Sequence, residues 1–87
     1  MDYSIISLSS VTAAKRVERA ALENGILCQT LHTPKVISKY GCSHSVRVKK
    51  VATEKVLLIC RQLGIQVRGV YEEKIVGKGK TEYVQIG

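Results

Sequence analysis

The stretch "YSIISLSSVTAAKRVERAALENG", residues 3–25, sets the pattern for the rest of the fold. Its first six residues are mainly apolar and predict a strand. A helix is expected next, because Ser9 or Ser10 can cap its start and Gly25 can end it. One face of this helix carries small apolar residues at helical spacing: Ala13, Ala14, Val17, Ala20 and Ala21. Such a small face lets the helix lie close to a sheet.

The same logic extends to residue 73. Residues 26–32 form a second predicted strand, which Pro34 stops because proline cannot donate to a ladder. "HSVRV" (44–48) is a third strand and "IQVRGVYEE" (65–73) a fourth. Between them a second helix over 51–64 has a predicted buried stripe of Ala52, Val56, Ile59, Cys60 and Leu63. This order predicts an α+β, ferredoxin-like βαββαβ sandwich, with a four-stranded antiparallel sheet and both helices on one face.

The remaining residues, 74–87, contain two short apolar runs around "GKGK". We expect a hairpin that extends the fourth strand, with a fifth strand near 82–86. The glycines also suit a frayed basic tail, which is the alternative. With 87 residues the chain makes one domain, so 1–73 is its main body and 74–87 an extension of it.

Composition favours a basic cytoplasmic protein. Fourteen Lys and Arg against seven Asp and Glu give a net charge of +7, which suits either anionic partners or solubility alone. The N-terminus has no basic region, and its apolar run is broken by serines, so we predict neither a signal peptide nor a membrane span. Three cysteines without such a signal indicate a reducing compartment.

The predicted topology puts the 33–43 loop at the same end of the sheet as the start of the first helix. That end is expected to be positive, from the helix macrodipole and from Lys35, Lys39 and Arg47. Cys42 lies in this loop, where neighbouring cations favour the thiolate. By contrast, Cys60 and Cys28 are predicted to pack in the core.

Other chemistry at this loop is less well supported by the sequence. His32 or His44 could pair with the Cys42 thiolate, but no acidic residue is evident to orient either ring. Cys42 and the two histidines do not have a recognised zinc spacing, so no metal site is predicted. "GKGK" lacks the spacing of a phosphate-binding loop. Four tyrosines without an RNP-like run make RNA recognition a weak reading.

Several short motifs resemble a family of small bacterial proteins described as selenium/sulfur (Se/S) carrier protein-like. The matching residues are Pro34-Lys35, Ile37-Ser38, Cys42 with Arg47 five residues later, and the closing "IQVRGVYE". The resemblance covers about residues 2–73. It departs from the family pattern at Ser43, which replaces a glycine, and in a loop one residue longer.

The resemblance implies a carrier without a cofactor, more a non-enzymatic carrier or binding protein than an enzyme. Cys42 would hold a persulfide or selenosulfide, received from one partner protein and given to another. Lys35, Lys39 and Arg47, with the helix start at Ser9 and Ser10, would stabilise the anion. The alternative is a regulatory or binding module for an anionic ligand, a partner protein or nucleic acid. A strand edge could also pair two copies of the chain.

Overall fold

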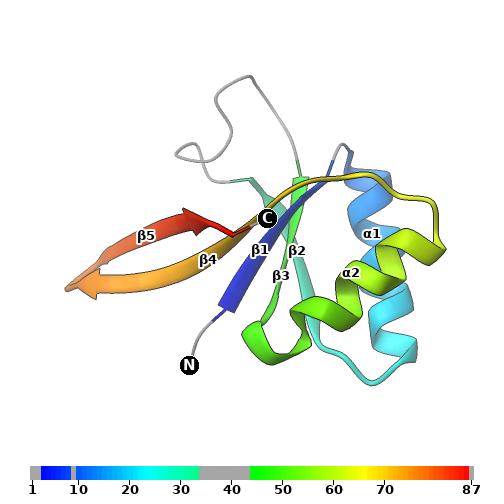
Figure 1. Cartoon of the computed structure of the whole chain (residues 1–87), viewed down its shortest axis with the longest axis horizontal. Coiled ribbons are helices and arrows are strands. Elements are labelled where there is room, and N and C mark those ends of the chain that lie inside the picture. Colours follow the sequence, from blue (N-terminus) through cyan, green and yellow to red (C-terminus); the bar gives the residue numbers. More distant parts are fainter. Residues whose placement is uncertain (1–2, 9, 34–43, 87) are drawn as a thin grey trace.

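The computed structural model describes residues 3–8, 10–33 and 44–86 (Figure 1). This part of the chain contains two α-helices and five strands. In order they are β1 (Tyr3–Leu8), α1 (Val11–Glu23), β2 (Cys28–His32), β3 (His44–Lys49), the 3-10 turn η1 (Lys50–Ala52), α2 (Thr53–Gln62), β4 (Val67–Gly77) and β5 (Lys80–Gln85). Neither described helix is long and apolar enough to cross a membrane.

All five strands form one antiparallel sheet in the order β2-β3-β1-β4-β5. The predicted α+β class is therefore confirmed, and the sheet has five strands instead of four because the expected C-terminal hairpin is part of it. As expected, β4 continues past residue 73, to Gly77, and β5 pairs with its outer part, so the alternative of a frayed tail is wrong. This hairpin projects away from the helices (Figure 1).

The two helices end in the same way, because each is followed by Gly-Ile. After α1, Ile26 N donates to Ala21 O at 2.8 Å and Gly25 N to Leu22 O at 3.0 Å, which is a Schellman motif. After α2, Ile65 N donates to Cys60 O at 2.9 Å. Gly25 and Gly64 have φ of 73° and 71°, which only glycine adopts at little cost.

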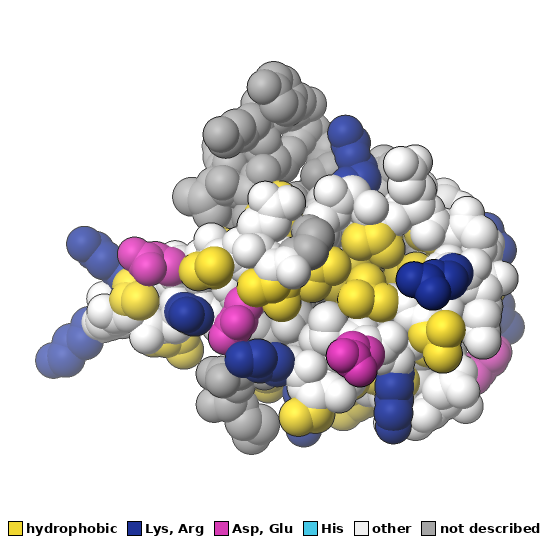
Figure 2. Space-filling model, in the orientation of Figure 1, with side chains coloured by type: hydrophobic (Ala, Val, Ile, Leu, Met, Phe, Trp, Pro, Cys, Tyr) yellow, Lys and Arg dark blue, Asp and Glu magenta, His cyan; other side chains and the backbone are white. Residues whose placement is uncertain are grey.

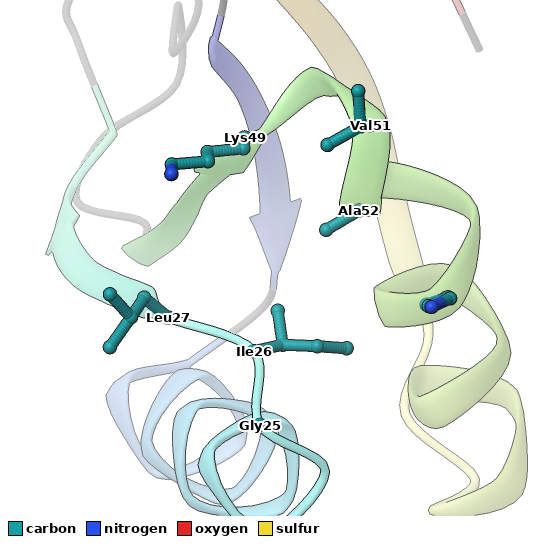
Figure 3. Close-up of a pocket in the computed structure, with 7 residues that line it drawn as sticks. Gly25, Ile26, Leu27, Lys49, Val51 and Ala52 are labelled. Carbon is teal, nitrogen blue, oxygen red and sulfur yellow. The ribbon is translucent and has the colours of Figure 1, made fainter.

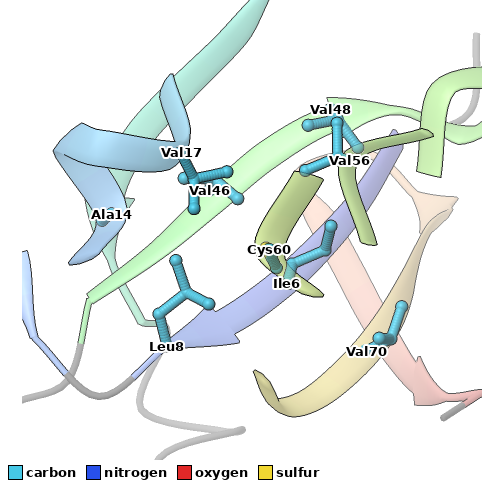
Figure 4. Packing of buried hydrophobic residues seen from close by; sticks show 9 residues of the cluster. All are labelled: Ile6, Leu8, Ala14, Val17, Val46, Val48, Val56, Cys60 and Val70. Atoms are coloured by element: carbon cyan, nitrogen blue, oxygen red, sulfur yellow. The ribbon is translucent and has the colours of Figure 1, made fainter. Parts of the chain in front are cut away.

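The core lies between the sheet and the two helices (Figure 4). Its buried members come from every layer: Ile6, Leu8, Ala14, Val17, Val46, Val48, Val56, Cys60 and Val70. The alanine-rich face of α1 is the face that packs here, as predicted. On α2 the predicted stripe is partly wrong, because Ala52 and Leu63 are half-buried, while Thr53 is buried and donates to Ser4 Oγ at 3.0 Å.

The opposite face of the sheet carries no described helix, yet its centre is buried. Ile5 is fully buried there, between its cross-strand neighbours Arg47 and Tyr71. The Tyr71 ring lies over Gly69, since a Cβ at Gly69 would come within 3.0 Å of it. β1 therefore has buried side chains on both faces.

The two edges of the sheet differ. At β2, the Glu18 carboxylate on α1 accepts from Thr30 N at 2.8 Å and also from the Thr30 hydroxyl. This side chain occupies a backbone donor that would otherwise be open to another strand. The outer edge of β5 adjoins no other described strand.

Gly64, after α2, and Gly77, at the end of β4, allow a matched test of why α2 ends at a glycine. Gly64→Ala should lower the free energy of unfolding by about 1–2 kcal/mol, because φ of 71° forces a Cβ against the following carbonyl. Gly77 has no heavy atom within 4 Å of an added Cβ and is not at positive φ. Gly77→Ala should therefore leave stability unchanged or slightly higher in urea titrations. Equal losses of unfolding free energy in both variants would contradict a special role for the positive φ at Gly64.

Candidate functional site at the 33–43 loop

The flanks of the predicted carrier loop lie where the topology placed them. Leu8 at the end of β1 pairs with His44 at the start of β3, and His44 pairs with His32 at the end of β2. The start of α1 follows directly on the end of β1 at this edge (Figure 1). Cys42, Lys35, Lys39 and Ser9 lie outside the described residues.

Two cross-strand contacts join the flanks of the loop. The His32 and His44 rings have centroids 4.4 Å apart at an interplanar angle of 41°. The Thr33 and Ser45 hydroxyl oxygens are 2.5 Å apart and both residues are buried. Residues 33 and 44 are therefore held close together, so the segment between them starts and ends at one point of the sheet.

The start of α1 supplies positive potential beside these flanks. Ser10 is the N-cap, since its Oγ accepts from Ala13 N at 3.2 Å. The first turn contains no acidic residue, so no carboxylate offsets the positive end of the helix dipole. Lys15 and Arg16 follow in the next turn and are exposed.

Arg47, the third predicted anion-binding cation, is already engaged. Its Nη2 and Nε donate to the two Glu73 carboxylate oxygens at 2.9 and 3.2 Å, and its guanidinium lies 3.9 Å from the centroid of the Tyr3 ring. The hydrogen bond to Glu73 raises the pKa of Arg47. Sequence reasoning missed Glu73, because the pairing depends on how β3 and β4 align on either side of β1.

The other two thiols are directed into the protein. Cys60 is fully buried in the core, as predicted, and burial raises its pKa. Cys28 on β2 is half-buried and packs against the core. Burial, with a smaller contribution from the nearby Glu18 charge, raises the pKa of Cys28 to about 12. Both side chains are therefore poor nucleophiles near neutral pH.

A metal centre finds no support in the part of the chain that the structure describes. Within it, no three His, Cys, Asp or Glu side chains come together. His32 and His44 form only a pair. His44 remains a predicted thiol partner, placed at the first residue after the undescribed segment.

A hollow lies at the end of the sheet opposite to His32 and His44, and the sequence did not predict it (Figure 3). It has a volume of about 280 Å³ and lies between the turn after α1 and the η1 connection. Leu27 and Val51 at its rim are 75% and 89% exposed. Among the described residues that line it, the two charged ones are Lys49 and Lys55, and none is a carboxylate. The signal in the sequence that could have indicated this hollow is the position of Leu27 and Val51, two apolar residues at or near the ends of the predicted helices.

The buried thiols predict a pattern of alkylation. At pH 8, native Cys28 and Cys60 should react with iodoacetamide at least about a hundredfold more slowly than in urea, because a pKa near 12 leaves little Cys28 thiolate. Cys28 labelling should rise as pH approaches 12. The measurement is peptide mass spectrometry after timed labelling, with the denatured protein as control. Equal native and denatured rates would contradict the burial.

Comparison with known proteins agrees with the motifs at the loop. The family model described as "Putative Se/S carrier protein-like" matches residues 2–72. No curated protein and no solved structure gives a significant match. The match spans most of the 87 residues, from before β1 into β4. The chain belongs to the Se/S carrier protein-like family.

Proposed function

We propose that the protein carries sulfur or selenium on Cys42, as a persulfide or selenosulfide. The observation that carries the proposal is that Cys28 and Cys60 are both directed into the protein. Cys28 and Cys60 face the core and have raised pKa values, so Cys42 is the thiol left for transfer. Membership of the Se/S carrier protein-like family supports the carrier role.

The transfer needs no cofactor. The Cys42 thiolate attacks the terminal sulfur of a persulfide on a donor protein, forming a new S–S bond while the donor's S–S bond breaks. The electron pair of the broken bond leaves with the donor thiolate, and Cys42 gains the sulfur with its proton. An acceptor nucleophile then attacks the same terminal atom and releases the Cys42 thiolate. Selenium transfer follows the same balance.

The anion is stabilised by the positive end of the domain. We assign this role to Lys35 and Lys39, together with the start of α1 at Ser9 and Ser10, where the first turn of the helix contains no acidic residue. The Arg47 guanidinium already donates to the Glu73 carboxylate, so it could bind the anion only while it keeps that contact. His44, which follows Cys42 closely in the sequence, is our candidate to exchange a proton with the thiol.

The setting we infer is cytoplasmic, with a sulfur or selenium donor and an acceptor as partners. The order β2-β3-β1-β4 within the sheet supports a ferredoxin-like arrangement with a fifth strand added. The carrier acts through one thiol, so it is a carrier and not an enzyme with a multi-residue active site.

Incubation with a persulfidated donor tests the carrier role. The protein should gain about 32 Da per transferred sulfur in intact-mass spectra, because one sulfur atom is added to one thiol. Cys42→Ser should abolish the gain, and dithiothreitol should remove it.

Two matched variants serve as controls, Cys28→Ser and Cys60→Ala. Cys28→Ser should keep the adduct in full. Cys60→Ala should keep it too wherever the variant remains folded by circular dichroism. An adduct that persists in Cys42→Ser, or that disappears in Cys28→Ser, would refute the assignment to Cys42.

A second candidate function is a binding module for an anionic ligand, favoured by the hollow in Figure 3. Apolar Ile26, Leu27 and Val51 line it together with Lys49 and Lys55. An apolar floor with two cations suits an amphipathic anion, or an acidic and apolar segment of a partner protein. The net charge of +7 would also attract nucleic acid, and that attraction should weaken with salt.

Anilinonaphthalene sulfonate, an apolar anion, probes this hollow directly. The double variant Lys49→Gln, Lys55→Gln should weaken its binding by about tenfold, because two charge-assisted contacts are lost. Lys78→Gln in the exposed turn of the hairpin is the matched control and should not change it. Fluorescence titration measures both. Equal affinities in all three proteins would exclude the hollow as the site.

A further inference from the structure

The hollow beside Lys49 is formed by two connections that are each held in place by hydrogen bonds. On one side, the turn after α1 is closed by the 2.8 Å hydrogen bond from Ile26 N to Ala21 O. On the other side, η1 runs directly into α2, where Thr53 Oγ1 donates to Ser4 Oγ at 3.0 Å. The hollow is therefore a fixed part of the folded domain, which lowers the entropy that a partner must lose on binding.

The rim of this hollow exposes two apolar side chains. Leu27 and Val51 are 75% and 89% exposed, and both border one concavity that Ile26 also lines (Figure 3). Its volume of about 280 Å³ lies below the range of about 300–1,000 Å³ for pockets that enclose a drug-sized ligand. The size therefore suits one inserted apolar side chain better than a whole small molecule.

The hollow is also positively charged. Lys49 and Lys55 line it, and neither forms an ion pair with another residue in the described part of the chain. The nearby carboxylates are engaged elsewhere, since Glu23 pairs with Arg19 at 3.9 Å and Glu54 lines a separate hollow between α2 and β4. Along the lower edge of Figure 2, hydrophobic side chains lie next to Lys and Arg side chains. This end of the domain therefore attracts carboxylates that carry apolar groups with them.

The hollow and the predicted carrier loop lie at the two ends of one strand. β3 begins at His44, beside the loop, and ends at Lys49, beside the hollow. The five steps between these residues span about 17 Å in a strand. A standard interface covers about 800 Å² of each partner, which is a patch roughly 30 Å across. One partner protein can therefore contact both ends of β3 at the same time.

We propose that the protein that supplies sulfur or selenium to Cys42 also binds this hollow, through a short acidic segment with one large apolar side chain. The apolar side chain enters between Leu27 and Val51, and carboxylates on either side of it pair with Lys49 and Lys55. The segment holds the donor on the domain while Cys42 reacts. This docking role rests on the proposed carrier role of Cys42.

Other anionic partners match fewer features of the hollow. The phosphates of a nucleic acid would use the lysines but leave the apolar rim in water. An anionic membrane surface would cover the rim but would not fill a concavity. An acidic segment with an apolar anchor uses the lysines, the rim and the concavity together.

Binding of a synthetic peptide tests the docking site. The probe is a fluorescein-labelled peptide with one phenylalanine between two pairs of glutamates, titrated with the full chain and followed by fluorescence anisotropy. Val51→Asp should raise the dissociation constant at least about tenfold, because it places a carboxylate where the glutamates must approach. Leu58→Asp adds the same charge at a 52% exposed position of α2 outside the hollow, and should leave the constant unchanged. A peptide with serine in place of phenylalanine should bind at least about tenfold more weakly.

A second measurement connects the hollow to the transfer. Both peptides are extended, at the N-terminal or the C-terminal end, by about ten Gly and Ser residues, whose root-mean-square length is about 17 Å, to a cysteine persulfide. The Cys42 thiolate takes the terminal sulfur and the peptide thiolate leaves, so the chain gains about 32 Da.

Tethering raises the effective concentration of the persulfide to the order of 1 mM. At about 10 µM donor, one of the phenylalanine donors should therefore load the wild type at least about tenfold faster than its serine counterpart. In Val51→Asp the ratio of the two loading rates should fall to about one, and in Leu58→Asp it should stay as in the wild type. Intact-mass spectra at timed intervals measure both rates, and circular dichroism checks that each variant is folded.

Equal peptide affinities in the wild type, Val51→Asp and Leu58→Asp would overturn the docking site. Equal affinity for the serine peptide would also overturn it, because attraction by charge alone would then explain the binding, as it would for nucleic acid. Binding to phosphatidylglycerol vesicles but not to the peptide would assign the hollow to a membrane surface instead. Tight peptide binding without faster loading would overturn the link to sulfur transfer. A wild type that gains no sulfur from any donor would refute the carrier role itself.

Discussion

Burial of β1 on both faces is the constraint on which the other elements depend. Ile6 and Leu8 pack toward the helices, and Ile5 is buried on the face without described helices. A strand with apolar groups on both sides needs a ladder partner at each edge and a cover on each face. β3 and β4 supply the ladders, and the short side chains of α1 allow a close cover. On the face without described helices, Ile5 is flanked by the side chains of Arg47 and Tyr71, which are half-buried.

Sorting of the thiols is a consequence of this layering. Cys60 sits on the inward stripe of α2, and Cys28 sits on the face of β2 that looks toward the core. The layered fold therefore lowers the reactivity of two thiols through desolvation. A protein that must present one reactive sulfur gains selectivity this way without any dedicated protective group.

The sequence was a good guide wherever a signal is local. Serine caps and Gly-Ile helix ends depend on a few adjacent residues, so α1 was placed well, and β1 begins and ends as predicted. The hairpin of β4 and β5 was also expected, from two short apolar runs around a glycine-containing turn. Contacts such as Arg47 with Glu73 join residues across an intervening strand, and no local pattern records that alignment. The same holds for the hollow beside Lys49, which two separate connections form.

The ion pair between Arg47 and Glu73 bears on where the domain stops. The Glu73 side chain is only 12% exposed, and it meets a guanidinium that rests on Tyr3. The family match ends at residue 72, one residue short of this carboxylate. A fragment cut at that boundary would leave a half-buried cation without its counter-charge, and β1 without part of its ladder. The contacts that hold Arg47 and the end of β1 therefore extend beyond the residues that the family model matches.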